Sequence, residues 1–360
     1  MGYNDWDNDN EPAVDRDHDW RAVPGDFDTI PVIDVAGIRS DDFDERRKIA
    51  AQIRDACVRV GFFYIQNHGI NDDVIQGVFK AAETFFALPF EQKMEVFIDN
   101  SPNFRGYTPI GGSGKPGADG RGNLNEAFEW GHDSKLNDDP NDACDDPYMK
   151  GRNRWPREPA DFEDQLSTYY RELRAFCRLL ARSVALSLGL DEDYFSSCTS
   201  HPGCASVLAH YPPQERGAAA RGLDAHTDSE FFTILAPGPV RALEVVNKAG
   251  EWISAPPKPG TFIVNVGDQL QAFTNDLYIS TRHRVMNYTG QQRYAIPFFF
   301  STNFETVIKP IPELLTGDQV ARNRQVSAGQ MYKENMTSLH RIASAVPDFA
   351  KYRKEEASTV

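Results

Sequence analysis

Four residues in the second half of the chain have the types and spacing of a metal site beside an anion-binding group. His226 and Asp228 form a His-x-Asp pair, and His283 and then Arg293 follow further along the chain. Two imidazoles and one carboxylate make the facial triad that holds non-haem Fe(II) and leaves positions open for oxygen chemistry. A guanidinium can bind a carboxylate through two parallel hydrogen bonds. Together these residues predict an iron oxygenase with an acidic cosubstrate.

Short strands are expected to position these side chains. Residues two apart on an extended strand share a face, so His226 and Asp228 can bind one metal from one side of a strand. The chain then reads as strands separated by Gly, Pro and Asn, a meander that would bring His283 back to the pair. The predicted strands are 233–236, 243–246, 251–254 and 261–266. A lone His-x-Asp is a weak signal, and the prediction depends on the later His and Arg in β-rich sequence.

These motifs resemble those of the Fe(II)/2-oxoglutarate-dependent dioxygenases of the isopenicillin N synthase-like type, from about Ile30 to Val346. The resemblance implies a mixed α and β fold with a double-stranded β-helix, or jelly-roll, core and flanking helices. It also implies Fe(II) held by His226, Asp228 and His283, with 2-oxoglutarate and O2 as cosubstrates. Other segments that carry the resemblance are 30–34 (IPVID), 61–70 (GFFYIQNHGI), 85–89 (FFALP), 104–107 (FRGY) and 208–213 (LAHYPP).

The same resemblance assigns residues to 2-oxoglutarate. Arg293 would anchor its C5 carboxylate, Tyr211 would donate a hydrogen bond to that carboxylate, and Leu243 and Val285 would make apolar contacts. Many family members have a serine two residues after the arginine, where this chain has Ala295. The missing hydroxyl forfeits roughly 1–2 kcal/mol if no water or neighbour replaces it. An iron oxidase of the same fold that does not use 2-oxoglutarate is therefore the alternative.

Strand alternation suggests which side chains line a substrate pocket. Ala295, Pro297 and Phe299 share the parity of Arg293, and Val207 and Ala209 share that of Tyr211, whereas His210 should face outward. Plain core packing explains the pocket aromatics equally well. We expect Asn265 and Asp268 to be turn residues. Glu126 and Glu129 are more readily explained as loop caps than as site residues. We expect His132 and His340 to have structural roles. The expected pocket residues are Phe104, Phe128, Val207, Ala209, Phe231 and Phe299.

The resemblance implies oxidation of a C–H bond of a small organic substrate, coupled to conversion of 2-oxoglutarate to succinate and CO2. Hydroxylation, desaturation and ring formation are all open, and we expect a role in secondary-metabolite biosynthesis. A binding protein on the same barrel is a third hypothesis, and an intact open metal site argues against it.

Periodicity and composition divide the chain into an acidic flexible tail (1–28), an N-terminal dioxygenase region (29–150), a helical support (151–204), the catalytic core (205–305) and a C-terminal helical region (306–360). Apolar residues recur at helical spacing, and Gly189 follows the third of the predicted helices. The predicted helices are 41–60, 74–88, 161–188 and about 328–345, and 102–147 reads as a long loop with short strands.

The net charge and the cysteine pattern restrict the possible binding partners of the protein and its cellular compartment. The net charge of −15 argues against nucleic acid and anionic membranes as partners. No run of about 18 apolar residues is present, and the acidic N-terminus lacks the features of a secretory signal. The five cysteines are scattered and form no CxxC pair, which is typical of reduced thiols. We expect a cytoplasmic enzyme with a small-molecule substrate, and the sequence carries no signal for oligomeric state.

Overall fold

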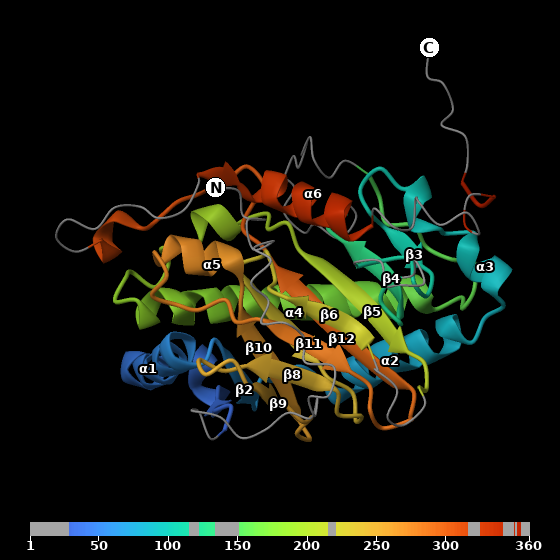
Figure 1. Cartoon of the computed structure of the whole chain (residues 1–360). Coiled ribbons are helices and arrows are strands. Elements are labelled where there is room, and N and C mark those ends of the chain that lie inside the picture. Colours follow the sequence, from blue (N-terminus) through green and yellow to red (C-terminus); the bar gives the residue numbers. More distant parts are fainter. Residues whose placement is uncertain are drawn as a thin grey trace, which may run out of the picture.

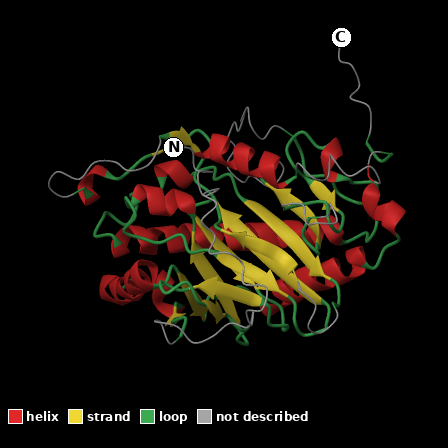
Figure 2. Cartoon of the chain, viewed as in Figure 1, coloured by secondary structure: helices red, strands yellow, loops and turns green. Residues whose placement is uncertain are grey.

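The computed structural model of the chain describes residues 29–114, 122–133, 151–214, 221–315, 325–340, 349 and 351–353. Two β-sheets lie at its centre, and the long helix α4 runs behind them (Figure 1). The helices surround the strands, as colouring by secondary structure shows (Figure 2). The arrangement is the jelly-roll core with flanking helices that the sequence predicts.

The larger sheet has eight strands, and all of its pairs are antiparallel except β1 with β2. Its central strands are apolar on both faces because helices cover one face and the barrel interior the other. In spatial order the strands are β1 (Val32–Asp34), β2 (Phe62–Gln66), β10 (Thr261–Val266), β7 (Phe232–Ala236), β12 (Arg293–Phe300), β5 (Ala205–Tyr211), β4 (Glu126–Gly131) and β3 (Gly106–Thr108).

The smaller sheet has four antiparallel strands. In order they are β6 (Arg221–His226), β11 (His283–Met286), β8 (Leu243–Val246) and β9 (Trp252–Ser254). A separate pair, β13 (Val307–Ile308) and β14 (Val326–Ser327), precedes the last described helix. The four strands predicted between the metal-site motifs are confirmed by β7, β8, β9 and β10, but their arrangement as a meander is wrong, because β7 pairs with β10 in the larger sheet and β8 pairs with β9 in the smaller one.

The predicted helices form within a few residues of their expected bounds. Asp42 and Asn71 accept hydrogen bonds from backbone N–H groups at the starts of α1 and α2, as N-cap residues do. Gly189, with a φ of 75°, follows α4. Residues 341–345 of the last predicted helix lie outside the described residues. The helices are α1 (Phe43–Arg59), α2 (Asp72–Phe86), α3 (Phe90–Met94), α4 (Phe162–Ser187), α5 (Asp268–Phe273) and α6 (Ala328–Leu339), with 3-10 turns η1 (Ala36–Arg39), η2 (Ile98–Asn100), η4 (Ser197–Thr199) and η5 (Pro312–Leu314).

Within the described part of the chain, no helix combines the length and hydrophobicity needed to cross a membrane. The apolar stripe of α4 is packed in the core, as its helical spacing predicts, and α1 and α2 pack against it.

The two faces of β12 have different surroundings. Ile296, Phe298 and Phe300 are fully buried in the main core with the apolar side chains of α4. Ala295, on the opposite face, packs with Ala209 and other residues of the barrel interior. Strand alternation therefore predicts correctly which face of β12 turns inward.

Candidate metal centre

His226, Asp228 and His283 come together at one end of the smaller sheet. His226 ends β6, His283 begins β11, and the two residues are directly opposite each other in the antiparallel pair. One ligand atom from each of the three side chains lies within 4.8 Å of the others. The Oδ1 atom of Asp228 is 3.5 Å from His226 Nε2 and 3.6 Å from His283 Nε2. The expectation that His226 and Asp228 share a strand is wrong, because β6 ends at His226 and Asp228 lies in the following loop.

Hydrogen bonds to the backbone orient both imidazoles. His226 Nδ1 is 2.8 Å from the carbonyl oxygen of Asp224, and His283 Nδ1 is 3.2 Å from that of Thr281. A carbonyl only accepts, so each Nδ1 carries the proton and donates it. The Nε2 lone pairs are therefore free to bind a metal, as in metal sites whose outer partners fix the histidine tautomer.

The carboxylate of Asp228 is held in a similar way. Its Oδ2 accepts hydrogen bonds from Thr233 Oγ1, at 2.5 Å, and from Asn265 Nδ2, at 2.8 Å. Thr233 and Asn265 are themselves opposite each other on β7 and β10. Because Oδ2 is engaged, Oδ1 is the atom left to face the two Nε2 atoms.

The turn assignment of Asn265 is therefore wrong, since this residue lies inside β10 and supports a candidate ligand. A polar residue inside the apolar run TFIVNV was the signal available in the sequence. A buried amide needs a hydrogen-bond partner, and such a residue marks a buried polar contact. Asp268 begins α5 and accepts a hydrogen bond from Thr227, beside the candidate ligands.

The charges of the cluster suit a divalent cation. Burial raises the pKa of Asp228, but His283, His226 and the hydrogen bonds lower it more, so the carboxyl is ionised. Burial, together with His226, lowers the pKa of His283 to about 4, so this imidazole is neutral at pH 7. A carboxylate and a neutral imidazole are the forms in which these side chains bind metals.

A second polar feature lies deeper in the barrel, where Arg293 on β12 is opposite Tyr211 on β5. Arg293 is only 2% exposed, and its Nε donates a hydrogen bond to the carbonyl of Val240 at 3.3 Å. Its guanidinium carbon is 4.8 Å from the centre of the Tyr211 ring. Among the described residues, no group accepts a hydrogen bond from its Nη1. A buried cation with a free N–H group is a site for an anion.

Small and apolar side chains surround this arginine. Ala295, Val285 and Ala209 form one buried cluster with Tyr211, and Val207 packs at its edge. Leu243 is opposite Val285 on the neighbouring strand and packs with the adjoining group around Val245 and Ile253.

The expected pocket aromatics divide into two groups. Phe299 is opposite Thr233, the residue that holds Asp228, and both Phe299 and Phe104 pack against a cluster that includes Tyr332 and Met336 of α6.

Phe128 and Phe231 are packed elsewhere, and their assignment to the pocket is wrong. Phe128 is opposite Leu208 on the helix-facing side of the sheet and contacts the rings of Phe85 and Phe162. Phe231 contacts Phe195 and Phe273 in the same core.

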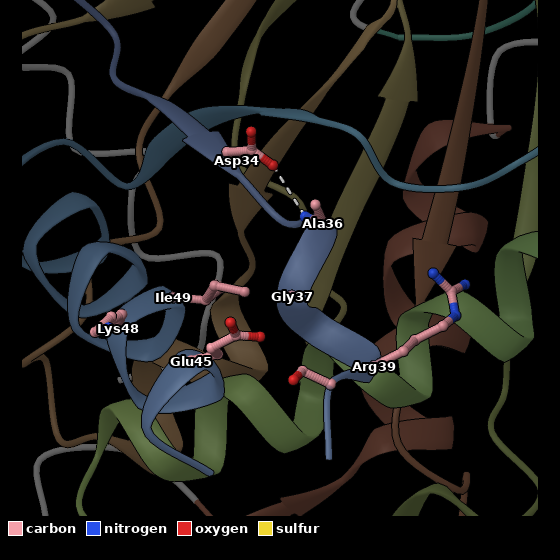
Figure 3. A pocket seen from close by; sticks show the side chains of 8 residues that line it. Asp34, Ala36, Gly37, Arg39, Glu45, Lys48 and Ile49 are labelled. Atoms are coloured by element: carbon pink, nitrogen blue, oxygen red, sulfur yellow. Dashed lines mark hydrogen bonds between the residues drawn. The ribbon is translucent and has the colours of Figure 1, made fainter. Parts of the chain in front are cut away.

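A separate hollow lies at the N-terminal end of the described chain. Figure 3 shows Asp34, Arg39, Glu45 and Lys48 around it, between η1 and the start of α1. It contains none of the residues of the candidate metal centre, and we assign it no part in the chemistry.

A jelly roll that gathers two histidines and an aspartate beside a buried arginine defines the class of 2-oxoglutarate-dependent iron oxygenases. Comparison with known families agrees. Residues 30–158 match the family described as non-haem dioxygenase in morphine synthesis N-terminal, and residues 202–302 match the 2OG-Fe(II) oxygenase superfamily.

Curated relatives cover most of the chain. It is 34% identical over 304 residues to homoarginine-6-hydroxylase 2-ODD-233 of Oryza sativa subsp. japonica, which covers 79% of this chain and 89% of the relative. It is 35% identical over 288 residues to the 2-oxoglutarate-Fe(II) type oxidoreductase ppzC of Metarhizium majus, which covers 75% and 77% of the two chains.

Among solved structures, a full-length Neurospora crassa protein crystallised in complex with alpha-KG and thymine is similar, with a TM-score of 0.78 and 25% sequence identity. The match covers 88% of this chain and 99% of that chain. The chain belongs to the 2-oxoglutarate-Fe(II) oxygenase superfamily. It is an oxidoreductase that uses Fe(II), 2-oxoglutarate and O2, and the expected class is confirmed.

Proposed function

We propose that His226, Asp228 and His283 hold the catalytic Fe(II). The main evidence is that Asp228 Oδ1 and the two histidine Nε2 atoms converge on one point. The other polar atom of each of these side chains already makes a hydrogen bond. Asp228 and His283 are buried, whereas the side chain of His226 is 34% exposed. The cluster thus has one side accessible to small molecules. When bound, iron with 2-oxoglutarate and O2 supplies the oxidising power for a C–H bond.

We further propose that Arg293 binds the C5 carboxylate of 2-oxoglutarate. Its unpartnered Nη1 supports this role, and the phenol of Tyr211, on the neighbouring strand, is the second donor. Val285 and Leu243 would exclude water from the carbon chain of the cosubstrate. Ala295 leaves room where a serine would donate, so Tyr211 and Arg293 make the polar contacts without it.

We propose a small organic substrate, bound next to the candidate ligands and against Phe299, Phe104, Val207 and Ala209. Phe299 and Val207 lie on the inward faces of their strands and are only partly buried, which supports their exposure to a ligand. The small molecules named with the relatives, homoarginine and thymine, are the first probes to use. A C–H bond held over the iron would be hydroxylated, desaturated or closed into a ring. We place the reaction in secondary metabolism, which the description of the matching N-terminal family supports.

We propose a cytoplasmic location. The four cysteines within the described residues, Cys57, Cys177, Cys198 and Cys204, are all free thiols, which is typical of a reducing compartment.

The test of the proposed function is succinate release by the purified protein with Fe(II), 2-oxoglutarate and each probe in air. Replacing His226 or Asp228 by alanine should reduce turnover to background, because two ligands cannot hold the metal as three do. His201→Ala, at a partly exposed histidine away from the cluster, is the matched control and should retain activity. Turnover that survives both ligand substitutions would contradict the proposal.

A further inference from the structure

The inward face of β4 carries a carboxylate that the metal and cosubstrate sites do not use. Glu129 on β4 is directly opposite Val207 on β5, and Ala127 is opposite Ala209. Val207 and Ala209 pack with Tyr211 in the barrel interior. Residues directly opposite in an antiparallel pair share a face, so Glu129 faces the interior as well.

Glu129 is buried without a well-formed hydrogen bond. It is 5% exposed, and among the described residues its polar contact is with His340, whose Nε2 lies 3.0 Å from Oε1. That contact is poorly directed, because neither ring nitrogen of His340 has a hydrogen-bond partner among the described residues.

Glu126, on the other face of the same strand, is a buried carboxylate with a full set of hydrogen-bond partners and serves as the comparison for Glu129. Its oxygens contact Lys93 Nζ at 2.6 Å, Tyr107 Oη at 2.5 Å and His210 Nδ1 at 2.7 Å. A buried carboxylate normally has such partners because burying an unpaired charge is costly. Among the described residues Glu129 has only the poorly directed contact with His340, and it faces the interior, which indicates that a ligand provides further donors.

The surroundings of Glu129 include residues proposed for the substrate site. His340, at the end of α6, stacks on Phe104, with ring centres 6.1 Å apart. The same helix reaches the loop of the candidate ligands, where Asn335 Nδ2 donates to Ser229 Oγ at 3.2 Å. The helix therefore borders both Glu129 and the residue that follows Asp228.

The buried guanidinium of Arg105 makes its hydrogen bonds elsewhere, although its Nε has no partner among the described residues. Arg105 donates from Nη1 to the carbonyl of Phe104 at 3.1 Å and to Tyr332 Oη at 3.0 Å, and it forms no ion pair with Glu129. Asn125, just before β4, adds a buried Oδ1 that accepts no hydrogen bond from a described residue. Asn125 Oδ1 is thus a second acceptor next to β4, whereas the unpartnered donor of the strand, Trp130 Nε1, lies on its other face.

We propose that Glu129 is a specificity-determining residue that binds a guanidinium group of the substrate. A guanidinium or ammonium brings several N–H donors and a charge, which match a buried carboxylate better than a neutral group does. The inference rests on the proposed oxygenase function, because it names the substrate class of that same site.

The test compares a cation with its neutral counterpart on the anaerobic Fe(II)–2-oxoglutarate enzyme. L-homoarginine and agmatine carry a guanidinium, and L-homocitrulline replaces it by an uncharged urea of the same shape. Binding is followed by calorimetry and by the change that a bound substrate makes in the visible spectrum of the iron complex. Wild type should bind at least one cation, and homoarginine at least about 10-fold tighter than homocitrulline.

Glu129→Gln keeps the shape of the side chain and removes its charge. It should weaken homoarginine binding by about 30-fold or more and change homocitrulline binding by less than about 3-fold. Glu129→Asp, which keeps the charge, should lose less than Glu129→Gln. Glu126→Gln is the matched control on the same strand, and it should leave the preference for the cation intact even if it lowers the melting temperature.

Equal binding of homoarginine and homocitrulline to wild type would overturn the inference, and so would unchanged homoarginine binding in Glu129→Gln. Failure of both cations to bind a complex that shows its 2-oxoglutarate band would also overturn it. If Glu129→Gln does not fold, the comparison of homoarginine and homocitrulline binding to the wild-type enzyme still tests the inference. Absence of the 2-oxoglutarate band itself would instead contradict the proposed function.

Discussion

Replacing Arg293 by methionine should stabilise the apoprotein and remove its response to 2-oxoglutarate. The guanidinium is 2% exposed, and no described carboxylate forms an ion pair with it. Burial lowers the pKa of Arg293, while Tyr211 partly offsets that effect, as expected for a charge removed from water. Exchanging buried charges for apolar side chains often stabilises a protein by about 1–4 kcal/mol.

The expected gain is at the lower end of that range because Arg293 already has some compensation. Its hydrogen bond to Val240 and its position over the Tyr211 ring are each worth about 1 kcal/mol and are lost on substitution. A net gain of about 1–2 kcal/mol corresponds to a rise in melting temperature of roughly 1–3 °C for a chain of this size.

Thermal unfolding with and without 2-oxoglutarate measures both effects. In wild type, cosubstrate at about 100 times its Kd should add about 2.7 kcal/mol of stability. Arg293→Met should show no such increase, whereas Arg293→Lys, which keeps a positive charge, should retain part of it. A methionine variant that is less stable than wild type, yet still stabilised by 2-oxoglutarate, would refute the reasoning.

Three further predictions concern neighbouring groups. Asn265→Leu removes a hydrogen-bond donor to Asp228 Oδ2 and should weaken metal binding by about 10- to 100-fold. An equilibrium metal titration measures this, and an unchanged metal affinity would contradict the role of Asn265. Ala295→Ser adds a hydroxyl beside Arg293 and should lower the KM for 2-oxoglutarate by about 5- to 30-fold in succinate assays, whereas an equal or higher KM would contradict the placement of the carboxylate. Burial, assisted by Arg105 and Arg174, lowers the pKa of His132 from 6.5 to about 4. Below pH 6.5 the unfolded chain takes up a proton that the folded chain does not, so the free energy of unfolding should fall as pH drops towards 4, by about 1.4 kcal/mol per pH unit. His132→Gln should have a shallower pH dependence, and equal slopes in chemical denaturation would contradict this assignment.

The sequence predicts the residues whose positions follow from local spacing. The order His226, Asp228, His283, Arg293 is a linear pattern, and the two-residue repeat of β12 separates Ala295 from Ile296 without any knowledge of the partner strands.

Aromatic residues were harder to place because both faces of the large sheet are buried. Phe128 and Phe299 have the same apolar strand context, yet one faces the helices and the other the interior. The parity with Arg293 places Phe299, whereas the face of Phe128 follows from the register of β4 with β5, which a single sequence does not give.

The supporting polar residues depend on contacts between distant segments. Asn265 and Thr233 meet Asp228 through the pairing of β7 with β10, and Glu129 meets His340 through the position of α6. No local motif joins these residues. For Asn265 the sequence does show a polar side chain inside a predicted apolar strand, whereas Glu129 lies in a segment that reads as a loop cap.

The most direct test of the central claim is anaerobic addition of Fe(II) and then 2-oxoglutarate to the purified apoprotein, followed by visible absorption. Chelation of 2-oxoglutarate to iron held by His226, Asp228 and His283 should produce a weak metal-to-ligand charge-transfer band. The band should be absent in Asp228→Ala and should need far more cosubstrate in Arg293→Met. No band in wild type with iron bound, or an undiminished band in Asp228→Ala, would contradict the proposed site.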